Sequence, residues 1–327
     1  MRILIIQFKR IGDLILTSSL LTVLHRYFPG VSIDLAVEKG SAGILPAFPP
    51  HTARIFTRGA LNLSELAVIT RSDYDVCLDL NGSDRSLLLT ALSRAKRRIT
   101  YQKVAKKFLR PRAYTDWVDS PLRKRHTVDH FLDILRPLGV SEEGESPVLN
   151  IPESEETRAG EALQSAGITG PCVVIHPGTA RAEKLWPPER WAAVAKWFQG
   201  NHALPVVITG VESDRAFAGI DRILRDSGNA CVSLVGKLSL LGTAAVIQRA
   251  KMLCSVDSAP IHIAEALRTP VVALFGPMNP YVWMPRHTAN RMVHPFIAPD
   301  AFSPETPAAK MEEISPESVI RNITEII

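Results

Sequence analysis

The chain has 327 residues, about twice the ~150 residues of an ordinary domain, so its length predicts two domains. A hydrophobic fraction of 46% with 22% charged residues excludes a disordered or fibrous chain and leaves enough apolar material for two cores. The net charge is only +5, and no apolar run reaches the ~18 to 20 residues of a membrane helix, so we expect a globular protein without a transmembrane segment.

The amino terminus and the cysteines indicate in which cellular compartment the protein lies. The opening MRILIIQF lacks the long apolar stretch and the small-residue cleavage site of a signal peptide, so we expect a cytoplasmic protein. The cysteines are too far apart for a CxxC metal or redox pair and too few for a dense disulfide framework; they are Cys77, Cys172, Cys231 and Cys254. Their apolar neighbours predict free thiols in the core.

Short apolar runs alternate with helical patterns along the chain, which is typical of βα units and a parallel sheet. Apolar residues recur at helical spacing over residues 14–27. In the first half we predict strands on both sides of this helix and further along, at residues 3–8, 31–37, 54–57 and 76–80.

A polar passage rich in Glu, at residues 141–156, interrupts the alternation and predicts a linker. We therefore expect domains at residues 1–150 and 151–327, with a terminal helix near 316–327 that packs back on the first domain. Two such open α/β domains usually bind a ligand in the cleft between them, at the carboxyl ends of their strands. The second half predicts five further strands, at residues 172–176, 205–209, 231–235, 252–255 and 270–275.

The first junction between a strand and a helix, QFKRIGDLIL, offers an acid. Gly12 permits a tight turn, and Asp13 follows at the helix start, where backbone N–H groups lack helical partners. Asp13 is therefore either a helix cap or, at the edge of a cleft, a general base that accepts a proton from a hydroxyl group. The junction has no GxGxxG pattern, which argues against a dinucleotide oxidoreductase.

Two junctions of the second half carry candidate ligand-binding side chains. After the strand at 172–176, Thr179 offers a hydroxyl group, and Lys184 offers an ammonium that is either solvated or directed at a phosphate. After the strand at 205–209, Glu212 is a candidate acceptor for ribose hydroxyls, a common use of an acid at the end of a strand.

The densest group of candidates follows the strand at 252–255. Asp257, Ser258 and Ala259 lead directly into a helix, and a helix start has free N–H groups and a partial positive charge that suit a diphosphate. His262, in the first turn of this helix, is placed to donate a hydrogen bond to a phosphate oxygen. The convergence of these residues favours a binding role over simple packing.

Gly276 ends the last strong strand and permits a tight turn that brings backbone close to a bound ligand. The histidines and acids of the junctions are scattered one by one along the chain rather than grouped at metal-ligand spacing. The sequence therefore predicts neither a metal site nor a cofactor.

Five segments, in this order, resemble the lipopolysaccharide heptosyltransferases, glycosyltransferase family 9. They are GDLILTSSLL, HPGTARAEKLWPPERW, ITGVESDR, DSAPIHIAEAL and FGPMNP, and they span Gly12 to Pro280. The resemblance implies a GT-B fold, in which two Rossmann-like, doubly wound α/β domains face a cleft, the first binding the acceptor and the second the sugar nucleotide. It also implies an inverting, metal-independent transfer of heptose from ADP-L-glycero-β-D-manno-heptose to the lipopolysaccharide core.

Carried over to this sequence, the resemblance assigns the catalytic base to Asp13, the family's lysine to Lys184 and the nucleotide-binding acid to Glu212. Chains similar to this one commonly have glycine where Ala259 stands, so the methyl group there is a departure. The FKRIGDLILT and HTVDHFLDILRPLGV segments resemble the third heptosyltransferase type. The donor-binding set implied by the resemblance consists of Thr179, Lys184, Glu212, Asp257, Ser258, Ala259, His262 and Gly276.

Positive charge is concentrated between Arg94 and Arg125, where twelve Lys and Arg residues stand against two acids. A solvated basic face is one interpretation. The other is attraction to a polyanionic acceptor and to the cytoplasmic face of the inner membrane. The segment lacks a nucleic-acid reading motif, so we expect a peripheral membrane contact and no nucleic-acid partner. The residues singled out for this contact are Arg97, Arg98, Lys106 and Lys107.

Two other functions stay open on the sequence alone. A sugar-nucleotide epimerase or hydrolase uses the same architecture and needs no acceptor. A non-catalytic sugar-nucleotide-binding module would have no need for the carboxylate of Asp13.

Overall fold

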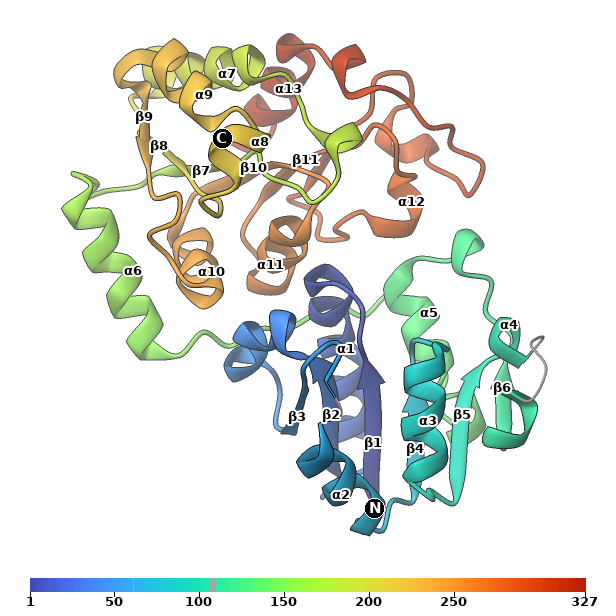
Figure 1. Ribbon diagram of the computed structural model, residues 1–327. Helices are drawn as coiled ribbons and strands as arrows, with labels where there is room; N and C mark the ends of the chain where they lie inside the picture. The colour runs from blue at the N-terminus through green and yellow to red at the C-terminus, as the bar shows by residue number, and fades with distance from the viewer. Residues whose placement is uncertain (61, 106–109) are drawn as a thin grey trace. The chain divides into compact units, whose positions relative to one another are not determined.

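The computed structural model describes the whole chain except residues 61 and 106–109. Contacts divide the chain into two compact units, Met1–Asn150 and Ile151–Ile327, and the division falls within the polar passage at 141–156. Each unit is built on its own six-stranded sheet, coloured from blue to green in the first unit and from green to red in the second (Figure 1).

The first sheet has the strand order β3-β2-β1-β4-β5-β6, and all neighbouring strands are parallel. The middle of its central strand β1 is apolar because both faces are covered: Ile3, Leu4, Ile5 and Ile6 are fully buried. The strands are β1 (Arg2–Gln7), β2 (Ser32–Glu38), β3 (Thr52–Phe56), β4 (Val76–Asp79), β5 (Arg97–Tyr101) and β6 (Asp116–Val118).

The helices of the first unit form two packed pairs, α1 with α5 and α2 with α3. From β1 the chain adds strands outward to β2 and β3, and then returns to the other side of β1 to add β4, β5 and β6; the order thus reverses between β1 and β4. Right-handed crossovers on the two sides of such a reversal point place their helices on opposite faces of the sheet (Figure 1). The helices are α1 (Ile11–Tyr27), α2 (Leu63–Arg71), α3 (Asp84–Leu92), α4 (Gln102–Ala105) and α5 (Thr127–Asp133).

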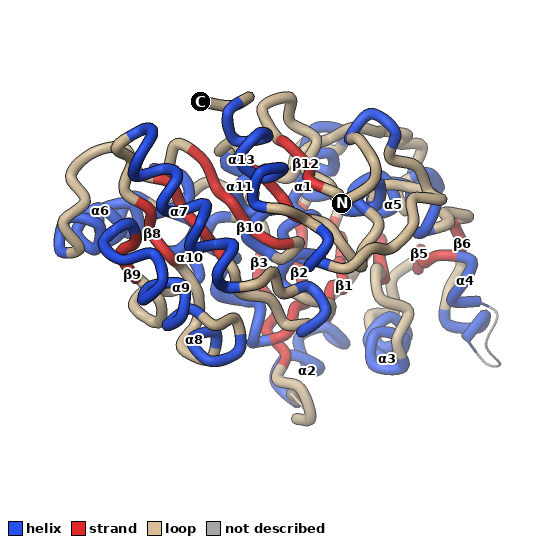
Figure 2. Tube along the Cα trace, turned by 90° about the horizontal axis from the view of Figure 1, so that it is seen from above, coloured by secondary structure: helices blue, strands red, loops and turns tan. Residues whose placement is uncertain are grey.

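The second sheet repeats this plan, with the parallel order β12-β11-β10-β7-β8-β9 and its reversal between β7 and β10. Figure 2 shows strands such as β8 and β10, in red, among the helices of this unit. The strands are β7 (Val173–His176), β8 (Val206–Ile208), β9 (Cys231–Ser233), β10 (Met252–Val256), β11 (Val271–Leu274) and β12 (Arg291–Val293).

The helices of the second unit also fall into two packed groups, α7 with α9 and α13, and α6 with α10 and α11. They cover opposite faces of the sheet (Figure 1). The helices are α6 (Glu153–Ser165), α7 (Pro188–His202), α8 (Asp214–Phe217), α9 (Ile220–Ser227), α10 (Leu240–Arg249), α11 (Ala259–Leu267), α12 (Pro280–Trp283) and α13 (Pro316–Thr324).

The terminal helix α13 packs against α7, β11 and β12 of its own unit. The expected contact of this helix with the first unit stays a prediction. Its apolar side chains Val319 and Ile323 are fully buried in the same core as Trp186 and Trp191. Trp186 also donates a hydrogen bond from Nε1 to the carbonyl of Ile314, 3.0 Å away, which ties the segment before α13 to this core.

Three strands were not predicted, and two of them lie in the basic segment. β5 and β6 pair with each other in register from Ile99 with Asp116 to Tyr101 with Val118. β5 opens with two arginines and β12 has only three residues, so neither presents the apolar run by which the other strands were predicted.

The prediction of free cysteines is confirmed: Cys77, Cys172 and Cys254 are buried, Cys231 is half-buried, and none is in a disulfide. Among the helices that the structure describes, none is both long enough and apolar enough to cross a membrane.

Candidate functional site

Each sheet has a reversal point where two loops at the carboxyl ends of neighbouring strands diverge, and such points are the usual ligand sites of open α/β sheets. In the first unit the loops follow β1 and β4. The backbone N–H of Phe8, after β1, donates to Oδ1 of Asn81, after β4, at 2.7 Å. This bond joins the two loops and fixes the entry to α1.

Asp13 lies in the first turn of α1, and its side chain is 14% exposed. The N-cap residue is Arg10, and no side chain makes a capping hydrogen bond at this helix start. The nearest opposite charge is the ammonium of Lys9, with Nζ 3.8 Å from Asp13 Oδ1. Asp13 is therefore not the N-cap residue of α1, although a backbone hydrogen bond at Asp13 itself helps to hold its carboxylate.

The backbone around Asp13 is held by a chain of buried polar side chains. The Gln7 amide donates from Nε2 to Oγ1 of Thr17 at 2.9 Å and accepts from the Lys9 N–H at 3.3 Å. The Thr17 hydroxyl donates in turn to the carbonyl oxygen of Asp13 at 2.9 Å. Gln7 thus connects the turn before α1 with the helix itself and fixes where the Asp13 side chain starts.

The electrostatic environment suits proton transfer. Burial of its carboxyl raises the pKa of Asp13 above the ordinary aspartate value, while the positive charges of Lys9 and Arg10 lower it. Burial dominates, so Asp13 is more basic than an exposed aspartate. A more basic carboxylate is a better proton acceptor near neutral pH.

In the second unit the loops follow β7 and β10. The hydroxyl of Ser255, in β10, donates to the carbonyl oxygen of His176, in β7, at 2.9 Å. The His176 ring is hydrogen-bonded through Nδ1 to Oγ1 of Thr209 at 3.0 Å. Burial lowers the pKa of His176 to about 4, so the imidazole is neutral at physiological pH.

Lys184 and Asp257 meet at this reversal point although 73 residues separate them in the sequence. Lys184 Nζ donates to Oδ2 of Asp257 at 2.6 Å and to its carbonyl oxygen at 3.2 Å. The two side chains are only 12% and 8% exposed. Lys184 is therefore not a solvated loop lysine, and since an ammonium has three N–H donors, one stays available for a phosphate oxygen.

The start of α11 lies beside this pair. Ser258 is the N-cap, without a side-chain capping bond, and Ala259 and Pro260 open the helix. His262 is buried, and burial lowers its pKa to about 4, with the charge of Asp257 opposing and that of Lys184 adding to this effect. The neutral imidazole is a hydrogen-bond donor rather than a cation, and the N–H groups of the first turn lack intrahelical partners.

Glu212 and Thr179 occupy the loops on the β8 side of the same edge. Glu212 is 71% exposed and its Oε1 lies 2.8 Å from Arg215 Nε. A Cβ at Gly236, where φ is +71°, would lie 2.5 Å from Glu212 Oε2, so this glycine makes room for the carboxylate. Thr179 is half-buried in the loop after β7.

Sequence reasoning missed one acid near these loops. Asp214 is buried, and its Oδ2 accepts from the Val211 N–H at 2.9 Å, so it fixes the loop after β8. A Cβ at Gly178 would lie 2.5 Å from the same oxygen. Burial raises the pKa of Asp214. Only its position six residues after the end of β8, at the start of α8, signalled it.

Packing within the protein itself explains why a glycine stands at position 276. The Gly276 carbonyl accepts from the Ala309 N–H at 2.8 Å, and an added Cβ would lie 2.7 Å from Met311 Sδ. The glycine is therefore needed for the close approach of the segment that leads to α13. This packing accounts for the residue whether or not a ligand also approaches the turn.

The four basic residues singled out for an anionic surface have different environments. Arg97 forms an ion pair with Asp116 and donates to the carbonyl of Pro137 at 2.6 Å. Arg98 donates to the carbonyls of Ala113 and Ala95 at 2.6 and 2.7 Å. Both arginines thus stabilise the edge of the first sheet. Lys106 and Lys107 lie outside the described residues.

No three His, Cys, Asp or Glu side chains in the described part of the chain are grouped so that they could hold a metal ion. Metal independence, which the resemblance implied, stays a proposal.

Known proteins resemble the chain over nearly all of its length. The lipopolysaccharide heptosyltransferase 3 of Escherichia coli is 27% identical over 86% of this chain and 85% of its own. The lipopolysaccharide heptosyltransferase 1 of Pseudomonas aeruginosa is 30% identical over 86% of this chain and 80% of its own.

Solved structures share the fold. The glycosyl transferase family 9 protein of Veillonella parvula superposes with a TM-score of 0.84 at 23% identity, covering 99% of this chain and 96% of its own. The Escherichia coli ADP-heptose LPS heptosyltransferase II gives 0.81 at 21% identity, covering 100% and 98%. These matches confirm the predicted α/β fold of the GT-B class.

The sequence also matches the family model of glycosyltransferase family 9 (heptosyltransferase) over residues 67–300. The chain belongs to this family and is a glycosyltransferase, which sets aside the epimerase, hydrolase and non-catalytic alternatives. Lys184, Asp257 and His262 lie inside the matched region, and Asp13 lies before it.

Proposed function

We propose that this enzyme transfers heptose from ADP-L-glycero-β-D-manno-heptose to an acceptor of the lipopolysaccharide core, with inversion and without a metal ion. The family and the relatives named above, which are lipopolysaccharide heptosyltransferases, support the sugar and the pathway. An E. coli neighbour described as an ADP-heptose enzyme supports the donor.

The observation that carries the proposal is the group at the start of α11. Lys184 lies 2.6 Å from the Asp257 carboxylate, next to a helix start and to the neutral imidazole of His262. Such a site offers hydrogen-bond donors and positive potential that are fixed before a ligand arrives, as diphosphate binding requires. We therefore propose that the second unit binds the sugar nucleotide.

Asp13 is the proposed general base. Its carboxylate takes the proton of the acceptor hydroxyl as that oxygen forms a bond to the anomeric carbon of the donor. The bond from this carbon to the diphosphate oxygen breaks on the opposite face, and ADP leaves. One displacement of this kind inverts the anomeric configuration, and the proton ends on Asp13.

Negative charge grows on the departing diphosphate, and this chain's own donors stabilise it in the proposal. They are the third N–H of Lys184, the first N–H groups of α11 at Ser258 and Ala259, and the imidazole of His262. Preorganised donors of this type are each worth ~3 kcal/mol in a transition state. Glu212 and Thr179 are proposed to contact the nucleoside, and Gly276 to bring backbone near the donor.

We further propose a cytoplasmic enzyme that contacts the inner membrane peripherally through its basic segment. Because Arg97 and Arg98 are engaged within the sheet, this contact falls mainly to cations that the structure leaves exposed. Among them are Lys103, Arg112, Arg123 and Lys124. Binding to vesicles with anionic lipid should weaken with salt and on the double change Arg123→Gln, Lys124→Gln; binding that ignores both would reject the contact.

Product analysis tests the function. The purified enzyme is incubated with ADP-heptose and a core acceptor, and the anomeric configuration of the new bond is read by NMR. We expect an inverted linkage and one ADP per transferred sugar. Donor incubated alone should stay intact. Thermal shifts should rise with ADP-sugars and not with UDP-sugars. A retained configuration, or transfer only from UDP-sugars, would reject the proposal.

A further inference from the structure

Lys9 is an unassigned cation next to Asp13. Its ammonium lies 3.8 Å from the Asp13 carboxylate and 5.3 Å from the centroid of the Phe131 ring, in α5. Its side chain is 30% exposed, so the ammonium keeps contact with solvent. The face of an aromatic ring attracts a cation, so this cation–π contact gives the Lys9 ammonium a defined position between α1 and α5.

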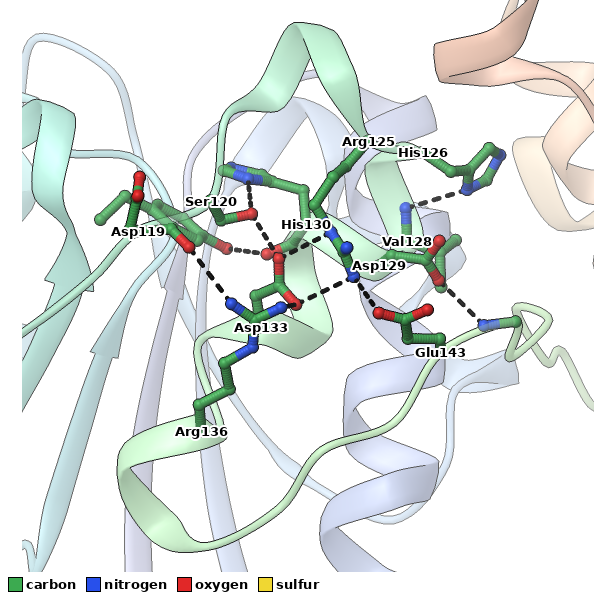
Figure 3. Close-up of polar contacts among 12 residues, drawn as sticks. Asp119, Ser120, Arg125, His126, Val128, Asp129, His130, Asp133, Arg136 and Glu143 are labelled. Carbon is green, nitrogen blue, oxygen red and sulfur yellow. Dashed lines mark hydrogen bonds and ion pairs between the residues drawn. The ribbon is translucent and has the colours of Figure 1, made fainter. Parts of the chain in front are cut away.

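Helix α5, which carries Phe131, is held in place by a buried polar network (Figure 3). The Ser120 hydroxyl lies 2.9 Å from Nδ1 of His130 and donates to the carboxylate of Asp133. Asp133, almost fully buried, also forms ion pairs with Arg125, at 2.8 Å, and with Arg136. Because these partners come from the segments before and after α5, the helix and its Phe131 ring have little freedom to move.

His130 contributes by staying neutral. Its ring stacks on that of Tyr101, with centroids 3.9 Å apart. Burial lowers the pKa of His130 to about 3, and the charges of Lys9 and Arg125 add to this effect. A protonated imidazole here would repel the ammonium of Lys9. Because this ring is neutral, the charged side chains that shift the pKa of the Asp13 carboxylate are Lys9 and Arg10.

The separation between Lys9 and Asp13 matters chemically. The Lys184–Asp257 contact, at 2.6 Å, places an ammonium hydrogen directly on a carboxylate oxygen. At 3.8 Å the Lys9 ammonium makes no such bond. Its charge still favours the ionised carboxylate, as does a backbone hydrogen bond at Asp13 itself, but the ammonium does not cover a carboxylate oxygen.

We propose that Lys9, held over the Phe131 ring, is a positioning residue that keeps the Asp13 carboxylate ionised and directed without itself hydrogen-bonding to the carboxylate. The catalytic part of this inference rests on the proposed role of Asp13 as the base. Burial raises the pKa of Asp13 and the charge of Lys9 lowers it. Removing that charge should raise the pKa of Asp13 further and narrow the pH range in which the base is ionised.

A titration of Asp13 in the intact protein without ligands tests the electrostatic part. The carboxyl carbon is followed by NMR in protein labelled with ¹³C-aspartate and assigned by its absence in Asp13→Asn. We expect a higher pKa in Lys9→Met and a value near wild type in Lys9→Arg. Arg10→Met is the matched control: it removes the neighbouring cation, which acts more weakly on Asp13, and should produce a smaller rise. An Asp13 pKa that Lys9→Met leaves unchanged overturns the inference.

The pH dependence of kcat tests the catalytic part. In Lys9→Met the acidic limb should move to higher pH, and kcat should return to within about twofold of wild type at about pH 8.5, where the carboxylate is ionised in both proteins. A merely structural role would lower kcat equally at every pH. If the NMR pKa moves but the acidic limb does not, the coupling stands and the base role of Asp13 falls, so the two proposals fail separately.

Discussion

The two units use one strand order for opposite electrostatic tasks. At the reversal point of the first, a largely buried carboxylate is 3.8 Å from its nearest cation. At that of the second, a buried lysine is in direct contact with an aspartate, 2.6 Å away, next to a helix start. A separated pair leaves the carboxylate open to accept a proton, whereas a contact pair holds an ammonium in place for an anion. The loops, and not the topology, decide which chemistry each sheet supports.

The largest expected effect is on the first unit's acid. Asp13→Asn keeps the shape but cannot accept a proton, so kcat should fall by about 10² to 10⁴-fold. Asp13→Glu should retain part of the activity. Because burial raises the pKa of Asp13, the ionised form carries a cost, and Asp13→Asn should not lose the ~1 kcal/mol typical of a lost helix cap. A kcat within twofold of wild type, measured at saturating donor, would remove Asp13 from the mechanism.

The next effect concerns the contact pair of the second unit. Lys184→Gln removes a donor to the diphosphate and leaves Asp257 without its partner, so donor affinity and kcat should both fall, the combined loss in kcat/KM reaching about 10²-fold. Lys196→Gln, an exposed lysine of α7, is the matched control and should change neither. Equal kinetics for the two variants would contradict the assignment.

Acid should weaken the second unit through His262 and His176, the two histidines whose pKa burial lowers to about 4. For His262 this compares with a pKa of 6.5 for an ordinary histidine. The unfolded chain therefore binds more protons in this window, and the stability contributed by the neutral side chain is lost as the pH falls from 6.5 toward 4, by ~3 kcal/mol at most. Urea unfolding at a series of pH values measures this. His262→Asn should make the dependence shallower and leave the part due to His176; an equally steep loss in the variant would assign the whole dependence to other groups.

The smallest effect tests whether Gly276 serves packing. Gly276→Ala places a Cβ against Met311 and the Ala309 carbonyl, and should cost about 1 to 3 kcal/mol of unfolding free energy. Gly200→Ala, where an added Cβ meets open space within α7, should instead stabilise the chain by ~0.5 to 1 kcal/mol. Thermal unfolding of both variants gives the comparison. A stable Gly276→Ala that no longer binds ADP would favour a ligand role over packing.

Much of the architecture could be predicted from local patterns. Apolar runs bounded by turns identified nine of the strands, and Asp13 was placed correctly at a helix start. The turn expected at Gly12 is wrong, because α1 already begins at Ile11 and Gly12 lies within it. The strands that escaped, β5, β6 and β12, are short or open with charged residues. Their place in the sheets depends on pairing with neighbours, which local periodicity does not encode.

The residues of the candidate site could be predicted from the sequence, but the contacts between them could not. Lys184 and Asp257 were both candidates, but only the fold brings them together across 73 residues. Arg97 and Arg98 had been assigned to an anionic surface because positive charge is concentrated in their segment. Charge density does not reveal the partners of a side chain, and in the structure Arg97 pairs with Asp116 while Arg98 donates to a backbone carbonyl. Lys9 was overlooked although its spacing of four residues before Asp13 is a known signal for a charge pair.

Parallel calorimetry of ADP binding to Asp13→Asn and Lys184→Gln tests the division of labour most directly. We expect Asp13→Asn to bind ADP as wild type does while its single-turnover rate falls at least about a hundredfold, and Lys184→Gln to bind ADP measurably more weakly. Loss of ADP binding in Asp13→Asn, or undiminished ADP binding in Lys184→Gln, would contradict this division.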